Sequence, residues 1–263
     1  MKFNLIFTIL KYTLLIVDLT FKIERSYMLE FKLYKIMATI FTPEFSITNT
    51  YNLVSTFQTL SNNRFDGELI SMPVPPDAPS QIPRLNLKSK NGTWQLEVSL
   101  ERTNLIFFKP VNLSVPMPSL FEFSEIAGNI FRAYKGKTKI VIQRLALITE
   151  RYAVIKENTP SQFLATKFCK NEYMKQPFNR TSAFEIHSLK KYEFNKFNLN
   201  SWIRLKTNNL ANEQRTPVLT MTNDINTYAS NEDPGVKFTQ KDLTRFFSSI
   251  PEHLESIINL YFN

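Results

Sequence analysis

The sequence predicts an α+β fold in which antiparallel sheets combine with amphipathic helices. Short alternating segments typical of strands are separated by turn residues at hairpin spacing, rather than by the crossover helices that parallel sheets need. Three helices are marked at their starts by capping motifs, Ser119-x-x-Glu122, Thr159-x-x-Gln162 and Thr239-x-x-Asp242. Because the order of strands followed by a helix occurs twice, we expect two similar β-meander-plus-helix lobes, residues 37–137 and 138–263.

Composition excludes several classes of protein. The chain has 263 residues, of which 43% are hydrophobic and 21% charged, so it can bury a core and is not disordered throughout. One cysteine and two histidines leave no disulfide framework, no thiolate zinc site and little material for an imidazole metal cluster. Neither GxGxxG nor GxxxxGK[ST] occurs, so the glycine-rich phosphate loops are missing. We expect no cofactor and no metal.

The net charge of +9 is a weak guide to partners. Asn, Lys, Ile, Phe and Tyr are all abundant, and their codons are rich in A and T. A base bias of the gene would therefore raise the lysine count without any nucleic-acid partner.

Residues 1–36 differ from the rest, because they contain no Gly and no Pro. They have three interpretations: a signal peptide or membrane anchor around Leu5–Val17, an element of the domain, or a non-native start upstream of Met37. The apolar stretch is shorter than the ~20 residues of a membrane span, and Lys11 interrupts it. The third interpretation is preferred. We expect a chain starting at Met37 to be soluble and folded, and the protein to be cytoplasmic and without a membrane partner unless residues 1–36 form an anchor.

The first lobe begins with a short amphipathic helix at 51–60. A proline-rich stretch at 73–83 follows; it is interpreted as a stiff crossing between strands, with a PxxP ligand for an SH3-type domain as the alternative. Asn91-Gly92 is a strong hairpin signal. The remaining elements expected are strands at 84–88, 93–99 and 103–109, and a helix that begins at Ser119 and ends near Lys135-Gly136-Lys137.

The second lobe repeats this pattern. A long apolar strand is expected at 138–152, and a short helix follows Thr159 with Pro160 at its first position. The terminal helix after Thr239 contains Pro251, which predicts a kink or two abutting helices. Three further strands are expected between these helices, at 182–194, 199–206 and 217–223.

Catalytic candidates are few. Glu185 and His187 share a strand face and form the minimum of a general base with an orienting carboxylate, but no Ser or Cys motif supplies a nucleophile. Asp224 lies in an Asn-Asp-Ile-Asn corner that resembles an acidic metal site, which Glu150 would complete if it reached across the sheet. The alternatives are a solvated polar pair for the first and an Asx turn for the second.

The tract 160–215 holds ten basic and four acidic residues, a net charge of +6. Alternating basic and aromatic residues on two neighbouring strands would suit single-stranded nucleic acid or a partner protein. The alternative is that the aromatic residues face the core while the lysines extend to solvent. The residues of this expected face are Lys190, Tyr192, Lys196, Trp202, Arg204 and Lys206.

Several stretches resemble an uncharacterised protein family that is sporadically distributed in bacteria and archaea. They are Pro76–Leu85 with Trp94–Asn104, then Arg144–Tyr152, Asn200–Arg204 and Asp224–Thr227. The resemblance covers the chain from about Met37 onward. It implies no catalytic residues, and the patchy distribution suits an accessory protein of a prokaryotic defence or mobile-element system.

We therefore expect a non-catalytic binding protein that acts through a protein partner. The first alternative is a binder of single-stranded nucleic acid through the 160–215 tract. The second is a hydrolase-type enzyme that uses the Glu185/His187 pair.

Overall fold

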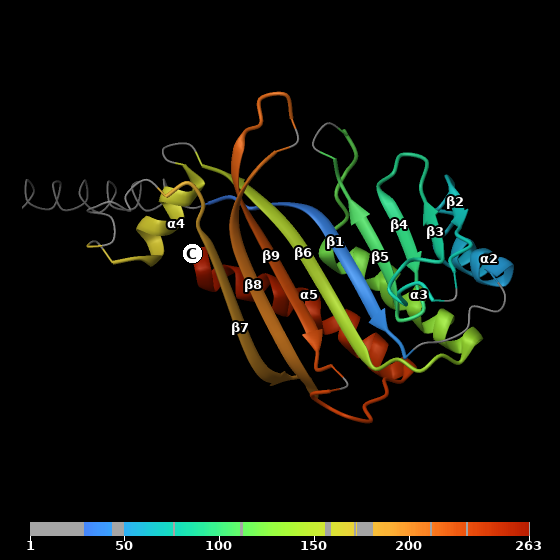
Figure 1. The fold of residues 1–263 in the computed structure, drawn as a ribbon. Coiled ribbons are helices and arrows are strands. Elements are labelled where there is room, and N and C mark those ends of the chain that lie inside the picture. The colour runs from blue at the N-terminus through green and yellow to red at the C-terminus, as the bar shows by residue number, and fades with distance from the viewer. Residues whose placement is uncertain are drawn as a thin grey trace, which may run out of the picture.

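The computed structural model describes residues 29–43, 50–75, 77–110, 113–155, 159–170, 172, 181–210, 212–229 and 231–262. These residues form nine strands and four helices (Figure 1). In chain order the elements are β1 (Lys32–Phe41), α2 (Thr50–Leu60), β2 (Leu69–Ser71), β3 (Leu85–Lys88), β4 (Trp94–Val98), β5 (Arg102–Phe108), α3 (Leu120–Thr138), β6 (Arg144–Val154), α4 (Pro160–Phe168), β7 (Glu185–Phe194), β8 (Phe197–Asn209), β9 (Pro217–Thr227) and α5 (Gln240–Phe262).

All the strands belong to one antiparallel sheet, in the order β2-β3-β4-β5-β1-β6-β9-β8-β7. The chain follows the same course twice. A long first strand, β1 or β6, is followed by a short helix, by a meander whose last strand returns to pair with the first, and by a long helix. The two first strands pair with each other at the centre of the sheet. The predicted α+β class, with antiparallel strands and amphipathic helices, is confirmed.

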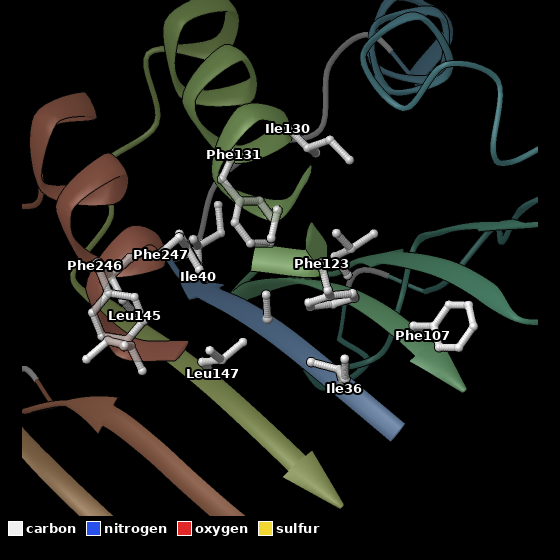
Figure 2. Close-up of a cluster of buried hydrophobic side chains, with 14 of the residues drawn as sticks. Ile36, Ile40, Phe107, Phe123, Ile130, Phe131, Leu145, Leu147, Phe246 and Phe247 are labelled. Carbon is white, nitrogen blue, oxygen red and sulfur yellow. The ribbon is translucent and has the colours of Figure 1, made fainter. Parts of the chain in front are cut away.

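Helices α3 and α5 pack against each other and cover one face of the sheet. The core lies between them and the strands: Figure 2 shows side chains of β1, β5 and β6 meeting those of the two helices. Ion pairing adds to this contact, because Arg151 Nη2 on β6 donates to Glu255 Oε1 on α5 at 2.5 Å. Residues at the centre of the core with no exposed surface include Ile36, Ile40, Phe123, Phe131, Leu147 and Phe246.

The helix starts follow the capping motifs. Ser119 accepts a hydrogen bond from the Glu122 backbone N–H and so caps α3, and Thr159 accepts one from Gln162 at the start of α4. The C-terminal end of α3 is closed by Lys139 in a left-handed conformation. Helix α5 runs as one element with Pro251 inside it, so the sequence-based alternative of two separate helices is wrong.

The boundary expected at Met37 falls inside a strand, because β1 begins at Lys32. Lys35 and Ile36 pair with β5 on one side and with β6 on the other, and the side chain of Ile36 is fully buried. Of the interpretations of residues 1–36, the domain-element interpretation therefore applies to Lys32–Ile36. The stretch Leu5–Val17 lies outside the described residues. Among the described helices none is long and apolar enough to cross a membrane.

Candidate functional site

The face of the sheet opposite α3 and α5 is not covered by any described helix (Figure 1), and we call it the open face. Opposed residues of an antiparallel pair point to the same side, so the register assigns each side chain to a face. Figure 1 looks onto the open face, and no described helix crosses it. Its central and outer residues are Phe41, Thr39, Met37, Lys35, Phe108, Arg144, Ile148, Glu150, Tyr152, Thr220, Thr222, Asp224, Asn226, Trp202, Arg204, Lys206, Leu189 and Lys191.

At one end of the open face a carboxylate is held by two groups from β1. Glu150 accepts hydrogen bonds from Tyr34 Oη at 2.7 Å and from Lys35 Nζ at 2.8 Å. A bulge in β1 between Leu33 and Lys35 allows both neighbours to reach the same carboxylate. Burial acts to raise the pKa of Glu150, but the hydrogen bonds from Lys35 and Tyr34 and the nearby positive charges outweigh it, so the pKa lies below its usual value.

A second polar network crosses the middle of the open face. Arg144 Nη2 donates to Asn226 Oδ1 at 2.7 Å, and Asn226 Nδ2 donates to Asp224 Oδ1 at 2.8 Å. The other carboxylate oxygen of Asp224 lies 3.6 Å from Arg204 Nη1, and the Arg204 guanidinium sits 5.1 Å from the ring centroid of Trp202. Arg204 is therefore paired with Asp224, whereas Arg144 is linked to that carboxylate only through Asn226.

The loop after β9 closes one corner of the open face. Glu232 accepts hydrogen bonds from Lys191 Nζ at 2.6 Å, from Asn200 Nδ2 at 3.0 Å and from the backbone N–H of Ala229 at 3.1 Å. These three bonds lower the pKa of Glu232 to about 2. The carboxylate thus remains ionised at any physiological pH and fixes the loop to β7 and β8.

The expected basic and aromatic face is divided between the two sides of the sheet. Phe194 pairs with Phe197 across a two-residue turn, so Leu189 rather than Lys190 lies opposite Trp202. Trp202, Arg204 and Lys206 consequently lie on the open face, whereas Lys190 and Tyr192 lie on the helix-covered face. Lys196 belongs to neither strand; it occupies the turn, where its φ is 68°. The prediction that these six residues form one face is wrong.

On the helix-covered side, Tyr192 contacts the second histidine of the chain. Tyr192 Oη and His253 Nε2 are 2.6 Å apart, and the Phe194 ring stacks on the imidazole with centroids 4.1 Å apart. The Lys190 ammonium lies 5.6 Å from the Tyr192 ring centroid. These groups join the edge strand to α5, which is a structural role.

Acidification is expected to weaken this contact. Burial and the nearby Lys190 charge lower the pKa of His253, so the unfolded chain binds the proton more readily than the folded one. The stability contributed by neutral His253 is present above the ordinary histidine pKa of about 6.5 and is lost as the pH falls below it. Urea titrations at about pH 7 and at about pH 5 measure this effect. Between these two pH values the free energy of unfolding should fall by less in His253→Gln than in the unsubstituted protein. An equal fall in both proteins would contradict the assignment.

The catalytic candidates do not converge. Glu185 Oε2 and His187 Nε2 lie 3.3 Å apart, but both side chains are about half exposed at the edge strand β7. Asp224 is held by Asn226 and Arg204, while Glu150 is bound to Tyr34 and Lys35, so the acidic pair considered from the sequence does not form. Within the part of the chain that the structure describes, no group of three or more His, Cys, Asp or Glu side chains is placed to hold a metal ion.

Sequence reasoning missed the group around Tyr34. It unites Tyr34 and Lys35 of β1, Phe108 of β5 and Glu150 and Tyr152 of β6. Tyr34 and Glu150 are separated by 116 positions in the sequence. The alternation of Glu150 and Tyr152 along one strand was the available signal, but the partner strand was unknown.

Comparison with known proteins does not add a family. No family model matches the chain, and no curated protein matches its sequence significantly.

Proposed function

We propose that this chain is a non-catalytic interaction protein that binds a protein partner through the open face of its sheet. The observation that carries the proposal is the asymmetry of the sheet: α3 and α5 cover one face, and no described helix covers the other (Figure 1). An antiparallel sheet with one uncovered face presents a broad, rigid surface.

The chemistry of the open face supports a protein partner. It mixes apolar groups such as Met37, Ile148 and Leu189 with polar side chains that already pair among themselves. Leu189 is 41% exposed and lies opposite Trp202 in the register. Protein interfaces combine such apolar contacts with a polar surround.

Single-stranded nucleic acid is the weaker candidate. A surface that binds single-stranded nucleic acid needs unpaired cations along the path of the phosphates and aromatic faces that are free for base stacking. Across the middle and outer part of the open face, Lys35, Arg204 and Lys191 each form an ion pair with an acid, and the Trp202 ring is contacted by Arg204. Lys32, Lys109 and Lys206 form no ion pair among the described residues, but they lie together at one end of the face, around Tyr152 and Thr220, and do not line a path across it.

A matched pair of leucine substitutions tests the proposal. Leu189→Glu places a charge on the open face, and Leu260→Glu places one on α5, where the side chain is 78% exposed. Affinity capture from the host should recover a protein with the unsubstituted chain and with Leu260→Glu, and lose it with Leu189→Glu. Equal recovery by all three chains would contradict the proposal. So would tight binding of an oligothymidylate probe whose affinity falls steeply with salt, because that dependence reports phosphate contacts.

A further inference from the structure

An apolar hollow opens on the open face beside the Glu150 group. It has a volume of about 160 Å³ and is lined by Tyr34, Phe108, Tyr152, Leu210 and Val218, with the polar residues Lys109, Asn208, Asn209 and Thr220 completing the lining. Phe108 remains 41% exposed, although an exposed phenylalanine ring is costly in water. A hollow of this size accommodates one large side chain, whereas small-molecule sites are about two to six times larger.

The rings around this hollow are held in place before anything binds. The Tyr34 hydroxyl donates to Glu150, and its ring packs edge-on against Phe108 with centroids 6.2 Å apart and against Tyr152 at 5.9 Å. Burial and the Glu150 carboxylate raise the pKa of Tyr34, so the hydroxyl keeps its proton and its donor role. A preformed pocket binds more tightly because little conformational entropy is lost on binding.

The rim of the hollow is positively charged. Lys109 lines it, Lys32 lies opposite Tyr152 in the register, and Lys206 lies opposite Thr220, which is itself a lining residue. None of these three lysines forms an ion pair within the described residues. The fourth, Lys35, is neutralised by Glu150. Among the described residues the hollow thus has three cations outside any ion pair around an apolar centre, of which Lys206 is near enough to Glu150 to help lower its pKa.

We propose that the hollow binds one bulky apolar side chain from an acidic segment of the partner protein. This inference rests on the proposed function and assigns the chemistry of its central contact. Buried aromatic or aliphatic anchors in a desolvated pocket carry most of the energy of protein interfaces, and complementary charge at the rim sets specificity and association rate. The acidic residues of the segment would face Lys32, Lys109 and Lys206.

The ring geometry favours a peptide side chain over a nucleotide base. Tyr34 and Phe108 meet at an interplanar angle of 78° and Tyr34 and Tyr152 at 57°, so the three rings form walls rather than a row of parallel stacking platforms. Surfaces that bind single-stranded nucleic acid need successive aromatic rings, on which the bases stack, along a cationic groove.

Short dye-labelled peptides test the inference by fluorescence anisotropy at low ionic strength. The probe has a central tryptophan flanked by aspartates; one comparison peptide has alanine in place of the tryptophan, and another has lysines in place of the aspartates. The full chain should bind the probe at least about tenfold more tightly than either comparison peptide. Phe108→Ala and Lys206→Glu should each weaken probe binding by about tenfold, because one removes a wall and the other reverses a rim charge.

Two controls are matched in chemistry. Phe121→Ala removes a 53% exposed ring from α3. Lys196→Glu reverses an exposed charge in the turn between β7 and β8, at the end of the hairpin remote from Lys206. Both variants should bind the probe as the unsubstituted chain does. The inference is overturned by absence of probe binding, by equal binding of the three peptides, or by displacement of the probe by oligothymidylate. If any of these occurs while Leu189→Glu still abolishes capture of the host partner, only the assignment of the hollow fails and the proposed function stands.

Discussion

A chain that begins at Met37 is expected to be far less stable than one that begins at Leu29. The shorter chain lacks Lys32–Ile36, which is half of the central strand β1. It loses the fully buried Ile36 side chain, whose removal alone corresponds to about 2–5 kcal/mol, together with strand hydrogen bonds to β5 and β6. It also leaves the Glu150 carboxylate without Tyr34 and Lys35. These losses are large beside the total stability of an ordinary domain, which is about 5–15 kcal/mol.

This result would reverse the expectation from composition that Met37 opens the folded part of the chain. Urea unfolding followed by circular dichroism measures it, with Ile36→Ala in the full chain as an intermediate case that should lower the free energy of unfolding by about 2–5 kcal/mol. Similar unfolding midpoints for the chains starting at Met37 and Leu29 would show that Lys32–Ile36 do not belong to the folded sheet.

Replacing Phe131 by alanine should lower the free energy of unfolding by about 3–5 kcal/mol. Phe131 lies on the inner side of α3, is fully buried, and contacts the Phe247 ring of α5 with centroids 5.6 Å apart (Figure 2). The substitution removes the apolar contacts of the ring and leaves a cavity at the junction of both helices and the sheet. Close packing there limits how far the neighbouring side chains can move to fill it.

Phe121→Ala on the same helix is the natural comparison, because its ring is 53% exposed. We expect that change to alter the free energy of unfolding by less than about 0.5 kcal/mol. Thermal and urea unfolding of the two variants side by side would decide the matter. If both variants lost a similar amount, α3 would not present Phe131 to the core.

The features that were predictable from the sequence are those set by near neighbours in the chain. Ser119 and Thr159 mark their helices because a cap depends on the next three residues. Asn91-Gly92 correctly predicted the β3–β4 hairpin, because Gly92, with a φ of 70°, takes a conformation that the turn requires. The alternation Leu96-Glu97-Val98 is likewise local, and Leu96 and Val98 are the buried residues of β4.

Assignments that depended on strand register were not predictable. Even-numbered aromatic and basic residues on β7 and β8 looked like one surface. The turn Asn195-Lys196, however, pairs residue 194 with residue 197, so even positions of one strand face the same way as odd positions of the next. Both turn residues have positive φ, as a two-residue hairpin requires, but Asn-Lys is a weak signal for it.

The hollow could not be predicted from the sequence, for a different reason. Its walls come from β1, β5, β6 and the ends of β8 and β9, and only the complete strand order brings them together. The bulge at Leu33/Lys35 turns Tyr34 toward Glu150, but no Gly or Pro lies next to it in the sequence to indicate a bulge.

The central pairing of β1 with β6 has a consequence for the order of folding. The β3–β4–β5 and β7–β8–β9 hairpins close over short loops, whereas the β1–β6 ladder joins residues more than a hundred positions apart, such as Lys35 and Glu150. Closing a long loop costs entropy that is recovered only when the contacts form, so distant pairings are slow. We expect the two meanders to form early and the central ladder to form last, as the event that joins them into one sheet.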